Sequence, residues 1–261
     1  MSGYIRREVE LSQRMPEKRP MAQGFVCGGG PRKTKRGRGV GGETGERSGR
    51  PRFDARDMFK NVAAALREKL KIDNVASYSI TDSDIADAMT RRIRKYASDA
   101  RVITDATACV GGNTASFARE FEVVHAIELD PKRAEYLEHN MAVLGLKNID
   151  VIHGDAIIEV PKRPQDVLYM DVPWLSDKTG TEAGVGKHYR DVDRLELFLG
   201  DMLLQDVCKL FTPHCRVLAL KVPKNFALAK FIHDTFDEYT LLDIMTDWRT
   251  MNLVILESKH K

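Results

Sequence analysis

Features that would assign this chain to a secreted, membrane or metal-binding class are missing from its sequence. No apolar run approaches the roughly 20 residues that a membrane-spanning helix needs. The opening MSGYIRREVELSQR has no apolar core of a secretory signal. The cysteines, Cys27, Cys109, Cys208 and Cys215, lack the spacing of metal ligands. We therefore predict no membrane contact, no metal site, and reduced thiols in the nucleus or the cytoplasm.

What the sequence does contain is a sharp separation of charge. Residues 1–56 hold 14 Lys and Arg against 6 Asp and Glu, with 11 of the 19 glycines, whereas residues 57–261 hold 27 basic and 32 acidic residues. A Gly-rich basic stretch buries too little apolar surface to offset its ordering entropy, so we expect a basic arm over 1–56 that is disordered when alone. Its charge favours RNA as a partner, and a solubilising tail or a localisation signal is the alternative.

The remaining residues divide into two regions by their hydrophobic periodicity. Apolar residues at three- and four-residue steps from Asp57, and the helix-start pattern T-D-S-D from Thr81, predict a helical extension over 57–98. Strand and helix patterns then alternate over 99–261. We expect strands at 102–107, 123–129, 149–154, 166–172, 215–222, 239–245 and 252–258, and helices from about Asn113, from Pro131, over 195–211 and over 226–235.

This alternation predicts an α/β fold of the Rossmann-like type. Alternating strands and helices form a parallel sheet with helices on both faces. The last two strands, joined by the short TDWRTM link, would add an antiparallel hairpin at the edge of a mostly parallel, seven-stranded sheet. In such a fold a ligand binds at the carboxyl ends of the strands.

Acidic residues follow four successive predicted strands: Asp105, Glu128, Asp155 and Asp171. An acid at the end of the second strand is placed to accept hydrogen bonds from two ribose hydroxyls, and Asp155 is able to accept one from an adenine amino group. Asp130, just before a proline, is better explained as an acid at a helix start. Four acids in register favour a ligand crevice as their explanation.

A glycine-containing turn, D-A-T-A-C-V-G-G-N at 105–113, joins the first of these strands to a helix. Gly111 and Gly112 permit close approach of a ligand to the backbone, and the helix that follows presents free N–H groups. The segment is neither the G-x-G-x-x-G of dinucleotide-binding proteins nor a phosphate loop, because no Gly-Lys-Ser/Thr follows.

Four segments of the sequence indicate a family. They are Y-S-I-T before the predicted helix at Thr81, D-A-T-A-C-V-G-G-N-T, A-I-E-L-D-P and the later P-W. Together they resemble those of a class I S-adenosylmethionine-dependent methyltransferase, over about residues 78–258. Within that superfamily the chain is most similar to the trimethylguanosine synthase group, the RNA cap guanine-N2 methyltransferases. The resemblance implies S-adenosylmethionine as the cofactor. It implies a site for the methionine part, the ribose and the adenine that is formed by Asp105, Cys109, Gly111, Gly112, Asn113, Glu128 and Asp155.

The resemblance also implies a catalytic and substrate-binding role for M-D-V-P-W. Asp171 and the carbonyl of Val172 would orient the lone pair of a guanine amine toward the methyl group. Pro173 would form the rigid turn that follows. Trp174 would stack on the base, and a positively charged 7-methylguanine would add a cation–π attraction of roughly 1–2 kcal/mol.

The chain departs from the family pattern in this region. Val172 stands where a proline usually rigidifies the turn, and the Gly-Gly that follows the tryptophan in the cap enzymes is missing. Loop 175–190 is Gly-rich and basic enough to close over a substrate, or it is an unrelated insertion. Lys221, Lys224 and Asn225, at the end of the fifth strand, are candidates for contact with a cap phosphate, and an exposed basic turn is the alternative.

We therefore predict a methyltransferase that acts on the exocyclic N2 amine of guanine in RNA, with the 7-methylguanosine cap as its substrate. The alternative among enzymes is a methyltransferase for ribosomal RNA or another nucleic acid. The alternative from another class is a catalytically degenerate methyltransferase fold that serves as an RNA-binding or structural assembly protein. Val172 motivates this last hypothesis, and so does the arm, which would become ordered inside a ribonucleoprotein or another large assembly.

Overall fold

The computed structural model of this chain describes residues 54–174 and 193–260. The basic arm predicted over 1–56 therefore lies almost wholly outside the described residues, and so does the loop at 175–190. Every helix within the described ranges is too short or too polar to cross a membrane.

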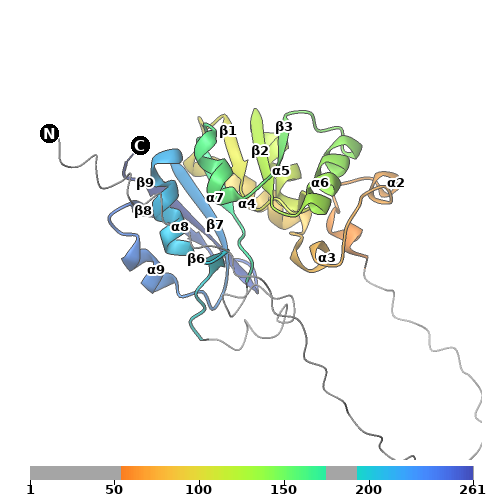
Figure 1. The fold of residues 1–261 in the computed structure, drawn as a ribbon. Helices are drawn as coiled ribbons and strands as arrows, with labels where there is room; N and C mark the ends of the chain where they lie inside the picture. Colours follow the sequence, from red (N-terminus) through yellow and green to blue (C-terminus); the bar gives the residue numbers. More distant parts are fainter. Residues whose placement is uncertain (1–53, 175–192, 261) are drawn as a thin grey trace, which may run out of the picture. The chain divides into compact units, whose positions relative to one another are not determined.

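A seven-stranded sheet forms the centre of the described chain (Figure 1). Its strand order is β3-β2-β1-β4-β7-β9-β8, and the first five of these run parallel. The strands are β1 Val102–Asp105, β2 Val123–Glu128, β3 Ile149–His153, β4 Val167–Met170, β7 Val217–Pro223, β8 Tyr239–Met245 and β9 Met251–Ser258. The antiparallel β9 pairs with β7 on one side and with β8 on the other, so the predicted hairpin at the edge is confirmed.

Helices cover both faces of this sheet, because its central strands bury both of their faces. In β4, Val167 and Tyr169 pack with residues of α4 and α5, whereas Leu168 and Met170 pack with residues of α8. Helix α6 lies on the α4 and α5 face, since its Leu137 packs with residues of α5 and β2. The helices are α4 Ser83–Tyr96, α5 Gly112–Glu120, α6 Pro131–Val143, α7 Ala156–Glu159, α8 Leu204–Phe211 and α9 Leu228–Asp234. The predicted Rossmann-like α/β class is confirmed.

The N-terminal extension differs from the prediction of a helix that begins at Asp57. Before Thr81 it forms only short turns, η1 Ala55–Met58, α2 Ala64–Arg67 and α3 Ala76–Ser79, whereas the helix predicted after Thr81 is present as α4. Its apolar residues Phe59, Val62 and Leu70 pack in one cluster with Val110 of the β1–α5 loop. These apolar residues therefore contact the domain from an irregular segment and do not form one face of a helix, because tertiary packing overrides the helical preference.

Two further expectations about helices are corrected by the structure. Helix α4 is capped by Asp82, whose side chain accepts from the Asp84 N–H at 2.9 Å, and not by Thr81. The predicted helix over 195–211 is helical only in α8. Before it, β5 Phe198–Leu199 and β6 Met202–Leu203 pair in a hairpin whose turn contains Gly200 at φ +58°, a conformation that breaks a helix.

Candidate functional site

The sheet order brings the four predicted acids together at the carboxyl ends of the parallel strands. Strands β3, β2, β1 and β4 are neighbours and parallel, so their carboxyl ends face the same way. Asp105 is the last residue of β1 and Glu128 is the last of β2. Asp171 comes directly after β4, and Asp155 follows β3 after one residue, Gly154. The structure thus places all four at the edge where ligands bind in parallel α/β sheets.

Glu128 joins the ends of the first two strands. Its carboxylate is buried, and its Oε2 accepts the Cys109 N–H at 2.9 Å. Its Oε1 accepts the Asp130 N–H at 2.9 Å and Nε of Arg133 at 3.1 Å. Because an ionised carboxylate has about four acceptor positions, these bonds fix its direction and still leave capacity for a ligand hydroxyl.

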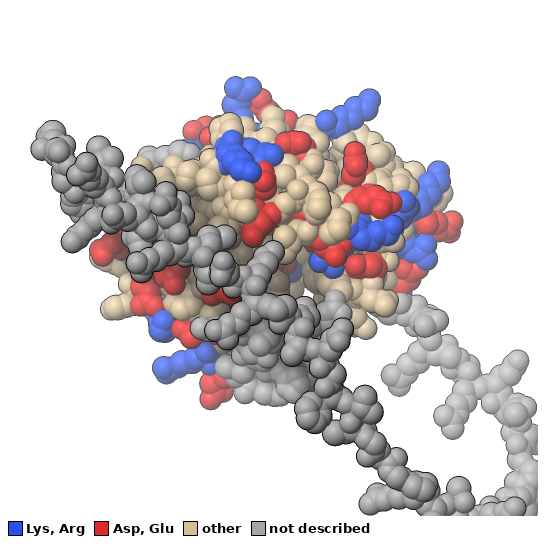
Figure 2. Space-filling model, in the orientation of Figure 1, with Lys and Arg blue, Asp and Glu red and all other residues tan. Residues whose placement is uncertain are grey.

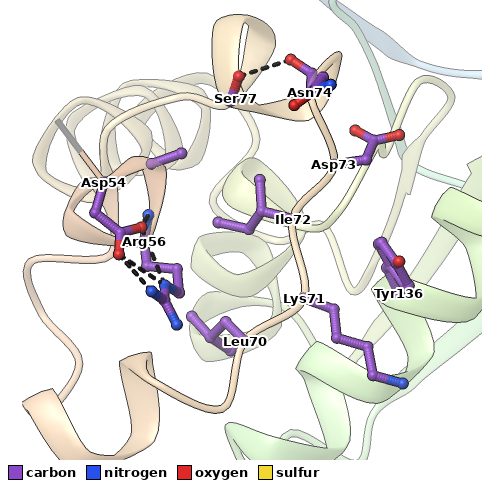
Figure 3. Close-up of a pocket in the computed structure, with 10 residues that line it drawn as sticks. Asp54, Arg56, Leu70, Lys71, Ile72, Asp73, Asn74, Ser77 and Tyr136 are labelled. Atoms are coloured by element: carbon purple, nitrogen blue, oxygen red, sulfur yellow. Dashed lines mark hydrogen bonds and ion pairs between the residues drawn. The ribbon is translucent and has the colours of Figure 1, made fainter. Parts of the chain in front are cut away.

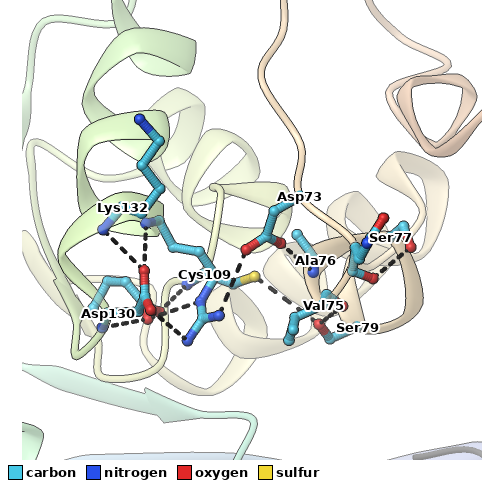
Figure 4. Close-up of polar contacts among 11 residues, drawn as sticks. Asp73, Val75, Ala76, Ser77, Ser79, Cys109, Asp130 and Lys132 are labelled. Carbon is cyan, nitrogen blue, oxygen red and sulfur yellow. Dashed lines mark hydrogen bonds and ion pairs between the residues drawn. The ribbon is translucent and has the colours of Figure 1, made fainter. Parts of the chain in front are cut away.

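The loop that carries Cys109 is held by the N-terminal extension as well. Cys109 adopts φ +51°, which turns its N–H toward Glu128, and its thiol faces the Ser79 hydroxyl at 4.0 Å (Figure 4). Burial raises the pKa of this thiol to about 12, so it remains protonated at neutral pH. A nucleophilic role for Cys109 is therefore not supported.

Two residues near Glu128 were not anticipated from the sequence. Arg133 bonds Glu128 and lies 3.6 Å from Asp73, a residue of the extension. Asp73 in turn accepts the Ala76 N–H at 2.7 Å, at the start of α3 (Figure 4). The available signal was the position of Arg133 in the first turn of a helix that follows a strand-end acid.

Asp105 is almost completely buried, with an exposed fraction of 1%. Burial raises the pKa of its carboxyl to about 7, while the hydroxyl of Thr114, which donates to it at 2.7 Å, acts in the opposite direction. The negative charges of Asp171 and Glu128 raise the pKa further. A cation bound beside Asp105 would stabilise the ionised form, so this position suits an ammonium group.

The two glycines of the loop have a packing role that the sequence analysis did not foresee. Gly111 has φ +100°, and a Cβ there would lie 2.4 Å from Cε of Met141. A Cβ at Gly112 would lie 2.9 Å from Cγ1 of Ile80 and 3.2 Å from the backbone of Thr81. The pair thus lets the loop fit between α6 and the segment before α4. Asn113, the next residue, donates to the Thr81 hydroxyl at 3.1 Å.

Replacement of Gly111 by alanine is expected to destabilise the fold by about 2–4 kcal/mol, because a left-handed backbone costs an L-residue about 1–2 kcal/mol and the collision with α6 adds to that. Thermal unfolding would measure the change as a fall of several degrees in Tm. Gly145→Ala is the matched control, since Gly145 has φ +70° but nothing within 4 Å of the added Cβ. Equal losses in the two variants would contradict the packing role.

Asp155 begins α7 and is exposed, and its side chain accepts the Ile157 N–H at 2.9 Å. The Gly154 N–H donates to the carbonyl of Glu128 at 3.0 Å, so the loops after β2 and β3 leave the sheet side by side. Two large apolar side chains are exposed here: Leu129, directly after β2, is 67% exposed, and Ile158, in α7, is 56% exposed. The sequence analysis missed both, although Leu129 directly follows Glu128.

The residues at the end of β4 form a second cluster around Asp171. Its Oδ2 accepts Nζ of Lys221 at 2.6 Å, and its backbone N–H donates to the Thr107 hydroxyl at 2.8 Å. Trp174 is half-buried, with its ring centroid 5.2 Å from Nζ of Lys221. Val172 points to the opposite face of the sheet, into the core beside α8, and Pro173 is exposed.

The structure corrects the expectation that Lys221 meets a cap phosphate. Its exposed fraction is 4%, because it lies inside β7 and its side chain runs along the sheet toward Asp171. Lys224 is exposed, and its Nζ donates to the carbonyl of Thr246 at 2.7 Å. The carbonyl of Asn225 accepts the Leu195 N–H at 2.8 Å. These contacts of Lys224 and Asn225 tie the turn after β7 to neighbouring segments, whereas Lys221 contacts Asp171.

Two other features of the described surface are less suited to bind a ligand. A cavity of about 420 Å³ lies between the extension and α6, and its wall includes Arg56, Lys71 and Tyr136 (Figure 3). Its charged groups are engaged locally, since Arg56 pairs with Asp54 and Nζ of Lys71 lies 5.7 Å from the centre of the Tyr136 ring. Figure 2 shows acidic and basic side chains intermixed on the visible face, without a patch of one sign. The cluster of acids at the strand ends therefore remains the candidate site.

Comparison with known proteins identifies the family. The sequence profile of the RNA cap guanine-N2 methyltransferases matches residues 100–247, more than half of the chain. The chain belongs to this family. The match covers β1 to β8 and includes every strand-end acid described above.

An uncharacterised protein of Acanthamoeba polyphaga mimivirus is 31% identical to this methyltransferase-family chain over 145 residues. Those residues are 54% of this chain and 52% of the viral protein, so the chain matches about half the length of that relative.

Two solved structures share the fold. A candidate RNA methyltransferase from Pyrococcus horikoshii has a TM-score of 0.51 at 15% identity, covering 76% of this chain and 98% of the other. A candidate class I S-adenosylmethionine-dependent methyltransferase from Listeria monocytogenes has a TM-score of 0.53 at 14% identity, covering 79% and 69%. The predicted class I methyltransferase fold is thereby confirmed. S-adenosylmethionine, the predicted cofactor, is the one named for the Listeria protein.

Proposed function

We propose that this family member transfers a methyl group to the exocyclic N2 amine of guanine in RNA, with the 7-methylguanosine cap as the substrate. The observation that carries the proposal is the position of Asp171 and Trp174 at the end of β4, on the same sheet edge as Asp105 and Glu128. An acceptor for an amine and a platform for a base thus lie beside the crevice for the cofactor. The family match supports the guanine specificity.

The strand ends of β1, β2 and β3 fit S-adenosylmethionine, which supplies a methyl group activated on a sulfonium. The buried Asp105 would attract the ammonium of its methionine part. Glu128, whose direction is fixed by Cys109 and Arg133, would accept from the ribose hydroxyls. The exposed apolar side chains beside Asp155 would cover the adenine, and burying them there would remove apolar surface from water.

The end of β4 would hold the substrate base. Asp171, as a carboxylate, would accept a hydrogen from the guanine amine, and the carbonyl of Val172 would accept the other. Trp174 would stack on the base. Methyl transfer depends on proximity and alignment, so the contribution of these three residues is to hold the amine with its lone pair directed at the methyl group.

The first test is binding of S-adenosylhomocysteine, measured by calorimetry on the full chain. We expect micromolar affinity, at least tenfold weaker in Glu128→Gln and lost in Glu128→Ala, because the ribose loses its charged acceptor. Glu138→Ala, a change at an exposed position of α6, is the control that should bind normally. No binding by the wild type would favour the alternative of a degenerate fold that acts as an RNA-binding or assembly protein.

The second test identifies the product. Capped RNA, uncapped RNA and ribosomal RNA would be incubated with labelled cofactor, and the methylated nucleosides separated by mass. The proposal predicts N2-methylated 7-methylguanosine from capped RNA only. Label found in an internal guanine or in an adenine would contradict the cap as substrate and favour another nucleic-acid substrate.

A further inference from the structure

The buried ion pair at the end of β4 points to a role for Lys221 that neither the family match nor the sequence analysis assigns. Lys221 extends from β7 on the same face as Val217 and Ala219, which are core residues. A lysine in such a position is costly unless its charge is paired. Here Nζ donates to Oδ2 of Asp171 at 2.6 Å and to the Thr81 hydroxyl at 3.0 Å.

This pair is not required by packing alone. A well-packed apolar residue in place of a buried ion pair is often neutral or stabilising, and the neighbours of Lys221 on its face of β7 are apolar. What the pair does achieve is to place a positive charge against Asp171, the carboxylate that the proposed function uses as the acceptor for the substrate amine. It also fixes that carboxylate from one side, through Oδ2.

The surroundings of Asp171 would otherwise favour its neutral form. Burial keeps the pKa of this carboxyl above its ordinary value even beside Lys221, which is the main group that acts to lower it, with a smaller contribution from Trp174. Asp171 in turn raises the pKa of two neighbours, the carboxyl of Asp105 on β1 and the phenol of Tyr169 on β4, so a negative charge on Asp171 is unfavourable to both. A protonated Asp171 would keep only a neutral carbonyl oxygen as acceptor, which binds an amine hydrogen more weakly than a carboxylate does.

We propose that Lys221 is a positioning residue for methyl transfer, which holds Asp171 as an oriented carboxylate so that it accepts a hydrogen from the target amine. The inference rests on the proposed function of Asp171. It also gives the N-terminal extension a part in the site, because the Thr81 hydroxyl that accepts from Lys221 also accepts from Asn113 of α5. The Lys221 ammonium thus connects Asp171 to Thr81 of the extension, and Thr81 connects both to Asn113 of α5.

The test compares Lys221→Gln, which keeps a donor but removes the charge, with Lys221→Arg, which keeps the charge. Urea unfolding is measured from pH 5 to pH 8.5 without cofactor or RNA. In Lys221→Gln, Asp171 would stay protonated in the folded state but ionise when unfolded, so the folded-to-unfolded ratio relative to wild type should fall by up to about tenfold per pH unit. Lys221→Arg should follow the wild type. Lys224→Gln controls for loss of an exposed lysine.

Methyl transfer to RNA is then followed over the same pH range. Lys221→Gln should be about tenfold or more slower than wild type near pH 6.5 and should recover as the pH rises, while its affinity for S-adenosylhomocysteine stays within about threefold. A merely structural role would lower the rate equally at every pH.

Two results would overturn the inference. One is an unfolding difference between Lys221→Gln and the wild type that does not change with pH. The other is a pH profile of methyl transfer by Lys221→Gln that equals that of the wild type. A wild type that neither binds S-adenosylhomocysteine nor methylates RNA would overturn the proposed function instead, and the unfolding comparison would still decide whether Lys221 controls the ionisation of Asp171.

Discussion

Replacement of Asp105 by asparagine is expected to make the folded protein more stable at pH 8 and to abolish its binding of S-adenosylhomocysteine. The pKa of this carboxyl is about 7 in the folded protein, against an ordinary value of 3.8. The folded state therefore holds the proton more tightly than the unfolded chain, so wild-type stability falls as the pH rises from about 4 to about 7. Asparagine cannot ionise and escapes this loss.

The expected gain for Asp105→Asn is on the order of 2–4 kcal/mol above pH 7, since each pKa unit corresponds to about 1.4 kcal/mol. Urea unfolding at pH 5, 6, 7 and 8 should show a difference from wild type that grows up to pH 7 and then levels off. Asp155→Asn, at an exposed strand-end acid, is the control and should show no comparable growth. A difference that is constant with pH would contradict the buried, proton-binding state of Asp105.

The loss of cofactor binding in the same variant separates function from stability. An ionised Asp105 would attract the ammonium of the cofactor, so wild-type affinity should rise between pH 6 and pH 8. Calorimetry with S-adenosylhomocysteine over this range would show that rise. If Asp105→Asn were more stable but still bound S-adenosylhomocysteine tightly, the proposed role of Asp105 in cofactor binding would be wrong.

The second large effect concerns Trp174, one of only two tryptophans in the chain. Replacement by alanine is expected to weaken binding of 7-methylguanosine triphosphate by about 10- to 100-fold, because stacking of one base on an aromatic ring is worth about 1–3 kcal/mol. Trp174→Phe should retain most of the affinity. Binding of the unmethylated guanosine triphosphate should be weaker in the wild type, since it lacks the charge that is attracted to the ring.

The second tryptophan, Trp248, lies in the link between β8 and β9 and packs on the core beside α4. Trp248→Phe therefore leaves Trp174 as the only indole and also serves as the matched control. In this variant the cap nucleotide should quench the fluorescence of Trp174, and its affinity should equal that for the wild type. Full binding by Trp174→Ala, or no quenching of Trp174 in the single-tryptophan protein, would contradict the stacking role.

The sequence alone determined those features that depend on local order along the chain. The alternation of strands and helices predicts the parallel sheet, because each strand and the helix after it must return the chain to the same edge. For the same reason Asp105, Glu128, Asp155 and Asp171 had to meet at that edge. The start of α6 was also local, since Asp130 caps it by accepting the Lys132 and Arg133 N–H groups just before Pro131.

Only the tertiary structure decided which buried charges meet. Lys221 is 50 residues from Asp171 and 140 from Thr81, and the pairing exists because β7 lies beside β4 and the extension crosses the sheet edge there. Apolar spacing predicts a helix from Asp57, but Phe59 and Leu70 lie between short turns and pack on the domain instead. Burial and long-range pairing are set by the whole fold, and they control the ionisation of Asp105 and Asp171 on which the proposed chemistry depends.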